Sequence, residues 1–189
     1  MIIRVFLLAA FWTLMLASCK EVSFREPQPA GVQALKEVPP ALRGQYVPAN
    51  LAANAPDEKG DTLIVESWGY HFKDSEDKDW LGRGVISDSL VIKFYQDYYF
   101  VNFRSGDQWV LRLIKQGPNG DLQFMSIDLQ SDDNSKDKQK LKKLSKKLKV
   151  TEVKRGDDTF YQINPTATQL MTLIKEGFFT GETLTRKTK

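Results

Sequence analysis

The chain has 189 residues and a formal net charge of +3, because its 27 Lys and Arg side chains nearly balance its 24 Asp and Glu side chains. This length is enough for one domain with a substantial core, and the small net charge excludes a strong global electrostatic field. A single histidine, a single cysteine and the absence of GxSxG, HExxH, CxxC and Gly-rich phosphate-loop motifs argue against nucleophilic triads, histidine-based metal sites and internal disulfides.

The first 18 residues, MIIRVFLLAAFWTLMLAS, have the features of a secretory signal peptide in the right order. Arg4 supplies a positive charge, an apolar run extends from Val5 to Leu16, and the small residues Ala17 and Ser18 follow. The apolar run is shorter than the ~20 residues that a membrane-spanning helix needs. We therefore predict a signal peptide that is removed on export.

The stretch Leu16–Cys19, LASC, resembles the lipobox of bacterial lipoproteins, in which a Leu, two small residues and a Cys mark the signal peptidase II site. The resemblance implies cleavage before Cys19, a diacylglycerol on its sulfur and an acyl chain on its new amine. Two or more chains, at ~0.8 kcal/mol per buried CH₂, would make membrane residence durable. The alternative is an ordinary secretory signal with an unmodified Cys19. In enteric bacteria, an Asp directly after the modified Cys resembles an inner-membrane retention signal. This chain has Lys20 at that position, so we expect it in the outer membrane of a Gram-negative cell envelope.

Residues 19–40 contain four prolines and little periodicity, which predicts a lipidated flexible tether. As a coil, residues 20–40 would span on the order of 25 Å. The remaining residues, 41–189, are predicted to form a single β-rich domain. Its first strands are expected at GQYV (44–47), around Asp61–Phe72 and at Gly82–Ser87.

The next segments predict an antiparallel meander. LVIKFY and YYFVNFR flank the two-residue turn Gln96-Asp97, which pairs Leu90 with Phe103 and Ile92 with Val101. The following strand has two possible registers. A two-residue loop at Gly106-Asp107 would bring Val110, Arg112 and Ile114 onto this apolar face. A three-residue loop, Arg104-Ser105-Gly106, would instead bring Trp109, Leu111 and Leu113 there, and we favour it because it leaves Arg112 outside the core.

The turn GPNGD, with Gly120 in the left-handed position, places Met125, Ile127 and Leu129 on the face of Leu113. Four consecutive strands would then share one apolar face, with a possible ligand pocket at Phe103, Trp109 and Leu111. The opposite face is also rich in apolar residues, so we expect another element to cover it.

Eight lysines lie between Lys136 and Lys149, with Leu141, Leu144 and Leu148 at helical spacing. This pattern predicts a Lys-rich helix over about 135–148. Its exposed lysines are a possible contact surface for an anionic headgroup layer or an acidic partner, represented by Lys142, Lys143, Lys146 and Lys147. The alternative is a solvated helix that docks by its leucines. Nucleic acid is not an expected partner, because export removes the chain from the cytoplasm and the aromatic residues lie apart from the lysines.

A further hairpin is expected to turn at Gly156-Asp157-Asp158 and to align Val153 with Tyr161. A C-terminal helix follows over about 165–176, capped by Asn164 and ended by Gly177. We expect this helix to cover the second apolar face of the meander.

The predicted fold class is α+β and β-rich: an antiparallel meander of about seven or eight strands in a partial or closed barrel, with a C-terminal helix and a Lys-rich helix. LRGQY (42–46), the meander and the late helix resemble lipocalin-like barrels. The expected function is that of a non-enzymatic, lipid-anchored envelope protein that acts through protein contacts, with no cofactor, metal or catalytic residue. The alternative is a lipocalin-like carrier of a small apolar ligand, and a carboxylate-based enzyme is a third hypothesis.

Overall fold

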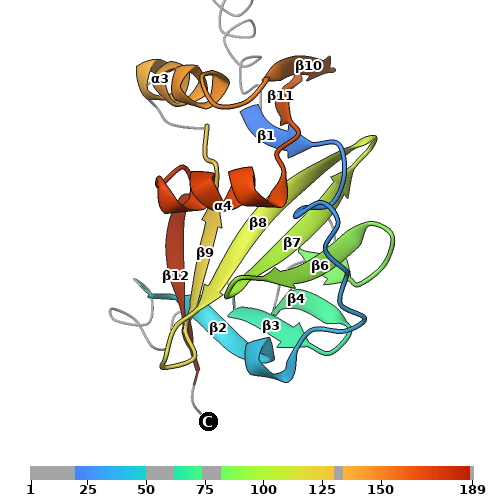
Figure 1. Ribbon diagram of the computed structural model, residues 1–189. Helices are drawn as coiled ribbons and strands as arrows, with labels where there is room; N and C mark the ends of the chain where they lie inside the picture. The colour runs from blue at the N-terminus through green and yellow to red at the C-terminus, as the bar shows by residue number, and fades with distance from the viewer. Residues whose placement is uncertain (1–19, 50–61, 74–81, 130–133, 188–189) are drawn as a thin grey trace, which may run out of the picture.

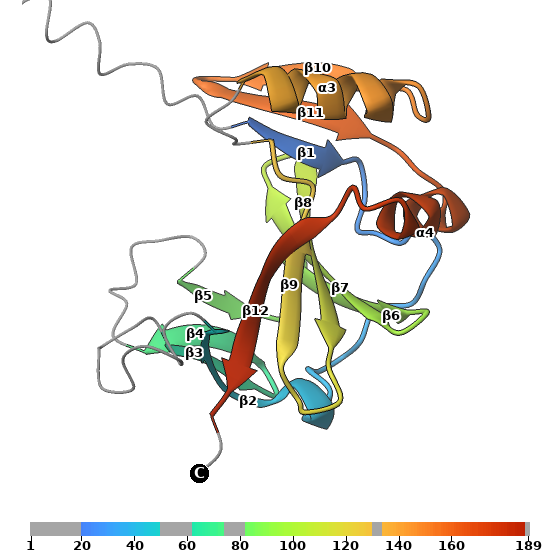
Figure 2. The ribbon, with the colours of Figure 1, turned by 90° about the vertical axis from the view of Figure 1, so that its left-hand side faces the viewer.

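The computed structural model describes residues 20–49, 62–73, 82–129 and 134–187, which form one large mixed sheet with two α-helices against it (Figure 1; Figure 2). The first half of the strands and a 3-10 turn are β1 (Lys20–Phe24), η1 (Pro40–Leu42), β2 (Gly44–Pro48), β3 (Thr62–Glu66), β4 (Gly69–Lys73), β5 (Arg83–Val85) and β6 (Leu90–Tyr95). The remaining elements are β7 (Tyr98–Ser105), β8 (Gln108–Gln116), β9 (Leu122–Ser126), α3 (Asn134–Ser145), β10 (Thr151–Arg155), β11 (Asp158–Ile163), α4 (Ala167–Lys175) and β12 (Thr180–Arg186).

The strand order is β10-β11-β1-β8-β9-β12-β2-β3-β4-β5, and β7 pairs with the other edge of β8 and carries β6. Among the described strands, only β1 and β11 pair in parallel; the other pairs are antiparallel. The predicted β-rich α+β class is confirmed. However, the described strands number twelve rather than seven or eight, and the sheet that they form is not closed into a barrel.

Two of the predicted hairpins have the expected register. Leu90 pairs with Phe103 across a turn in which Gln96 and Asp97 have φ values of 47° and 67°, as a type I′ turn requires. Leu113 pairs with Met125 across the turn that contains Gly120, whose φ is 86°. Both registers depend on local signals, a turn of defined type and alternating apolar residues.

The predicted register of β7 with β8 is wrong. Phe103 pairs with Val110 and Val101 pairs with Arg112, so the loop is the two-residue Gly106-Asp107 alternative. Gly106 has a φ of 62° at the first central position of this turn, which suits the type II′ geometry. Trp109, Leu111 and Leu113 therefore lie on the opposite face, and Arg112 lies on the same face as Val101 and Phe103.

The observed register was disfavoured because it buries the charge of Arg112. In the structure, this charge has a partner. Its guanidinium donates a hydrogen bond to the carboxylate of Glu21 in β1. The side chains of Arg112 and Glu21 are only 15% and 16% exposed, so each charge is stabilised by the other inside the fold. The sequence separation of 91 residues makes this pair invisible to local pattern analysis.

The β10–β11 hairpin shows the same one-residue error. Val153 pairs with Phe160 instead of the predicted Tyr161. Gly156, with a φ of 57°, begins a two-residue turn in place of the predicted three-residue loop. A Gly-Asp dipeptide thus forms a tight turn in both misassigned hairpins.

The prediction of a flexible tether is wrong from Lys20 onward. β1 lies inside the sheet between β11 and β8, and its Val22 and Phe24 are 4% and 1% exposed. The segment after β1 is also fixed, because the buried Lys93 ammonium donates hydrogen bonds to the carbonyls of Pro27 and Pro29 at 2.7 and 2.9 Å. Tertiary hydrogen bonds therefore order a proline-rich segment whose composition is typical of a coil.

Two further differences concern strands. The single strand expected around Asp61–Phe72 is a hairpin of β3 and β4, in which Leu63 pairs with Phe72. β12 was not predicted, although it joins β9 to β2 and so connects the two halves of the sheet. The pattern of β12, TGETLTR, contains a single large apolar residue, which explains why hydrophobic periodicity does not reveal it.

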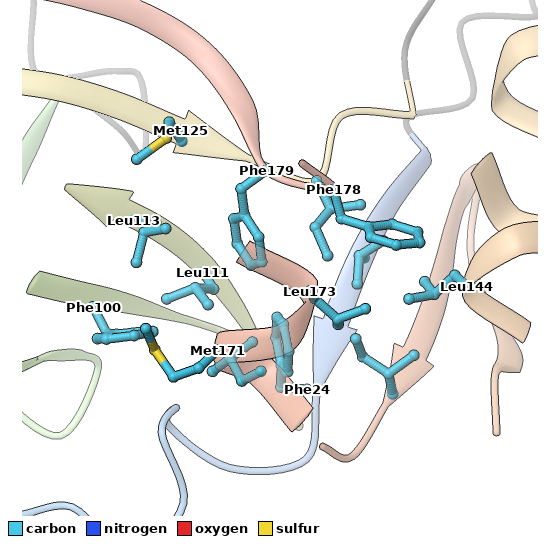
Figure 3. Packing of buried hydrophobic residues seen from close by; sticks show 14 of the residues in the cluster. Phe24, Phe100, Leu111, Leu113, Met125, Leu144, Met171, Leu173, Phe178 and Phe179 are labelled. Atoms are coloured by element: carbon cyan, nitrogen blue, oxygen red, sulfur yellow. The ribbon is translucent and has the colours of Figure 1, made fainter. Parts of the chain in front are cut away.

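One apolar core lies between the sheet and the helices, and we call it the helix-covered core (Figure 3). α4 contributes Leu170, Met171 and Leu173, which pack with sheet residues that include Phe100 and Leu113. The C-terminal helix covers an apolar face, as expected, but the composition of that face was predicted only in part. Phe100 was expected there, whereas Leu111 and Leu113 were expected on the other face because of the wrong β7–β8 register. The predicted cap of α4 is wrong, because the Thr166 hydroxyl, and not Asn164, accepts a hydrogen bond from the Gln169 amide at 3.2 Å.

The second core lies on the other face, where the sheet curls from β6–β9 through β12 to β2–β4, and we call it the curled-sheet core. Its buried members are Val38, Leu42, Tyr46, Leu63, Leu90, Ile92, Val101, Phe103, Leu122 and Leu184. Residues of β4 reach across to β7: the ring of Tyr70 meets that of Phe103 edge-on at a centroid distance of 6.2 Å. Both faces of the sheet are therefore apolar, which removes the polar face that usually fixes a register.

Candidate functional site

The curled-sheet core is incompletely filled and contains a partly open cavity of about 350 Å³. Strands β2, β3, β4, β6, β7, β8, β9 and β12 all contribute side chains to its wall. Natural small-molecule pockets have volumes of about 300–1,000 Å³, so the cavity has room for a small ligand. Because strands distant in sequence form the wall, the cavity exists only in the complete tertiary fold.

The wall is apolar because alternate residues of each strand point to the same face. β7 contributes Val101 and Phe103, and β9 contributes Leu122 and Phe124. Ile114 of β8 also lies in the wall, whereas its neighbour Leu113 lies in the helix-covered core. This alternation gives the cavity aliphatic and aromatic walls.

Tyr70 and Phe72 of β4 supply the aromatic part of the opposite wall, together with Leu63 and Val65 of β3. The rings of Tyr70 and Phe72 lie edge to face at a centroid distance of 6.4 Å. Such edge-to-face pairs hold ring orientations and favour a fixed cavity shape.

Two charged residues, Arg112 and Glu182, also line the cavity. The Arg112 guanidinium donates to the Glu21 carboxylate and, at 3.3 Å, to the Leu111 carbonyl. Arg112 is thus neutralised by its ion pair, and Glu182 adds no positive charge. An apolar, uncharged molecule fits this environment better than an anion does, since an anion would have to displace Glu21.

The predicted pocket residues are separated by the structure. Phe103 lines the cavity, but Leu111 is buried in the helix-covered core and Trp109 packs against that same core. The misassigned β7–β8 register is the cause, because a shift of one residue moves every side chain of β8 to the other face. Sequence reasoning missed Leu63 and Tyr70; the SWG sequence between them was the available signal for a hairpin that brings both strands to one wall.

The lysine residues of the predicted contact surface lie elsewhere, at the end of the molecule opposite β2–β4 (Figure 1). Lys142 and Lys143 are exposed on α3, and Lys146 and Lys147 are exposed just after it. Lys147 forms an ion pair with Glu176 at 2.7 Å. Leu144 is 0% exposed, so α3 docks onto the sheet by its leucines. Cys19 lies outside the described residues.

No protein-family model, curated protein or solved structure matches this chain. Within the described ranges, no helix has both the length and the hydropathy for crossing a bilayer. Function is therefore inferred from the cavity and from the sequence.

Proposed function

We propose that this protein is a lipid-anchored, non-enzymatic carrier of a small apolar ligand in the outer membrane of a Gram-negative bacterium. The apolar cavity of about 350 Å³ in the curled-sheet core is the observation that carries the proposal. A well-packed core normally has few voids larger than a water molecule. A void of this size, lined almost entirely by apolar side chains, is characteristic of a binding site.

The proposed ligand is uncharged and small. The cavity lies near the lower limit of known ligand pockets, which favours a molecule with one short chain or a few rings. Burial of an anion would be opposed by Glu182 and by the Glu21 carboxylate that already occupies the Arg112 guanidinium. Aromatic wall residues such as Phe103 and Tyr70 favour flat or unsaturated groups.

Acylation of Cys19 is the proposed anchor, on the basis of the lipobox resemblance of LASC. It would keep the carrier at one membrane, where an apolar molecule enters or leaves the bilayer. Intact mass analysis of protein purified from its own envelope tests this part of the proposal, and an unmodified Cys19 thiol would refute it.

Titration with the neutral fluorescent probe N-phenyl-1-naphthylamine tests the cavity. We expect saturable binding with one probe per chain. Substitution Val65→Trp fills the cavity from β3 and should weaken probe binding by at least about tenfold, because the indole occupies the ligand volume. Circular dichroism should show that the variant keeps its fold.

Val85→Trp is a matched control. It makes the same change in side-chain volume on β5, at a residue that is 46% exposed and does not line the cavity. Probe affinity should be unchanged in this variant. Equal weakening by both substitutions, or non-saturable binding by the unmodified chain, would refute the carrier proposal.

Contact with another envelope protein is the second candidate function. The apolar sheet face that includes Leu111 and Leu113 is covered by α4. The exposed lysines of α3 remain, and the unchanged recovery of crosslinked envelope proteins after Lys142, Lys143, Lys146 and Lys147 are changed to Glu would exclude them as a protein-contact surface.

A further inference from the structure

The point at which the chain enters the fold lies beside α3. Lys20, the residue that follows Cys19, is the first residue of β1 and pairs with Thr159 of β11. Glu21 forms a β-bridge with Asp128, whose carbonyl accepts a hydrogen bond from the Lys140 ammonium of α3 at 2.8 Å. Figure 2 shows α3, β10, β11 and β1 gathered at one end of the molecule.

The α3 segment at this end has a strong net positive charge. Residues 134–149 contain eight of the 27 basic side chains and one of the 24 acidic side chains of the chain. The rest of the chain has 19 basic and 23 acidic residues and is therefore net acidic. The nearly neutral total thus conceals a strong separation of charge along the sequence.

The lysines of α3 point outward because its leucines point inward. Leu144 is buried, and Leu141 and Leu148 are partly buried against the same core. At 100° per residue, the face opposite these leucines carries four exposed lysines, which we call the α3 lysine surface: Lys136, Lys142, Lys143 and Lys146. Lys140 and Lys147 lie to the side and bond to Asp128 and Glu176.

We infer that the α3 lysine surface rests on anionic phospholipid headgroups, next to the membrane-inserted acyl chains of Cys19. The inference depends on the proposed anchor. Consecutive Cα atoms lie ~3.8 Å apart, so an acylated Cys19 holds Lys20, and with it this end of the sheet, close to the bilayer. Polybasic surfaces in such a position are attracted to anionic lipids and reinforce lipid anchoring.

This orientation has a consequence for the carrier. β2, β3 and β4, which form one wall of the cavity, lie at the end of the molecule away from α3 (Figure 1). The cavity would then face away from the bilayer. Ligand exchange would take place with the aqueous compartment, or with a soluble partner, rather than by direct extraction from the membrane.

Headgroup quenching tests the orientation in the full lipidated protein. Because the only native cysteine is Cys19, an introduced cysteine gives a single free thiol for a fluorophore once Cys19 is acylated. One label is placed at Gln139→Cys on the outward side of α3, and the other at Pro118→Cys in the exposed β8–β9 turn at the opposite end. Vesicles of phosphatidylcholine, with or without phosphatidylglycerol, carry a nitroxide on their headgroups.

We expect quenching at position 139 to exceed quenching at position 118 at least about twofold in the anionic vesicles, and to fall as salt screens the lysines. Changing the four residues of the α3 lysine surface to Gln should remove the difference between anionic and neutral vesicles. A matched control makes the same charge change at exposed lysines elsewhere and should retain that difference: Lys36, Lys73, Lys115 and Lys187.

Equal quenching at position 139 in neutral and anionic vesicles would overturn the inference. So would an unquenched label accompanied by specific crosslinks from α3 to an acidic envelope protein. A bare Cys19 in the intact mass spectrum would refute the anchor separately. In that case, selective cosedimentation of the protein with anionic vesicles would still support the α3 lysine surface, and no cosedimentation would overturn it.

Discussion

The two faces of the same sheet are completed in different ways. In the helix-covered core, Phe100, Leu113, Leu144 and Leu170 are all 0% exposed, because α3 and α4 close the face. Among the described residues of the curled-sheet core, only Tyr46 reaches 0%, and a cavity of about 350 Å³ remains between its walls. A helix can adjust its position until it fills a sheet face, whereas a sheet folded toward itself is limited by its backbone curvature. We therefore expect the helix-covered core to contribute most of the stability and the curled-sheet core to bind the ligand.

The largest expected effect compares neighbouring residues of β8. Leu113→Ala should lower the free energy of unfolding by about 4 kcal/mol, because it leaves a void in a closed core. Ile114→Ala should lower it by only about 2 kcal/mol, since Ile114 borders space that already exists. Urea denaturation measures both values, and equal costs would contradict the distinction between the two cores.

The Arg112–Glu21 ion pair connects β8 to β1 at the edge of the cavity. Arg112→Met should cost about 2 kcal/mol, because it leaves the Glu21 carboxylate partly buried without its partner. Adding Glu21→Gln should recover about 1 kcal/mol of this loss, since the unpaired charge is then removed. A double-mutant cycle in urea measures the coupling, and strictly additive losses would show that the two charges do not stabilise each other.

Lys93 fixes the proline-rich segment that follows β1. Lys93→Met should cost about 1.5 kcal/mol, because the carbonyls of Pro27 and Pro29 lose their donor. Burial lowers the pKa of Lys93 below its ordinary value of 10.5. Between the lowered pKa and about 10.5 the unfolded chain binds more protons than the folded one, so the contribution of Lys93 to stability rises with pH in that window.

The difference in unfolding free energy between the unmodified chain and Lys93→Met should therefore grow as the pH approaches 10.5. Denaturation of both proteins at several alkaline pH values measures it. A difference that stays constant or shrinks would contradict the assigned direction of the pKa shift.

The smallest expected effect concerns the start of α4, the helix that closes the first core. Thr166→Ala should lower the free energy of unfolding by about 1 kcal/mol, because the first turn loses its cap. Asn164→Ala, two residues earlier and exposed, should have an effect below about 0.5 kcal/mol. Thermal denaturation of the two variants distinguishes the observed cap from the one that the sequence predicted.

Features with local causes were predictable from the sequence. The β6–β7 hairpin follows from a tight turn between alternating apolar runs, and α3 follows from leucines at helical spacing. Features that depend on distant partners were not. β1 resembles a coil until β11, 139 residues away at the pairing of Lys20 with Thr159, is considered. β12 can be recognised only from its pairing with β9 and β2.

The candidate site shows the same limit. Phe103 was predicted to line a pocket and does so, but its expected neighbours Trp109 and Leu111 lie on the other face. Hydrophobicity could not separate the two registers of β8, because both faces of the sheet are buried. The predicted register was the one that keeps the charge of Arg112 outside the core, and it was wrong. The partner of Arg112, Glu21, lies in a segment whose prolines predicted a tether.

The account depends most directly on the apolar space in the curled-sheet core. Diffraction from crystals under xenon pressure tests it, because xenon enters dry apolar cavities large enough to hold it. We predict xenon density between Phe103 of β7, Leu122 of β9 and Leu63 of β3, and no xenon inside the helix-covered core. A curled-sheet core that contains ordered water in place of xenon, or whose side chains fill the space, would contradict the account.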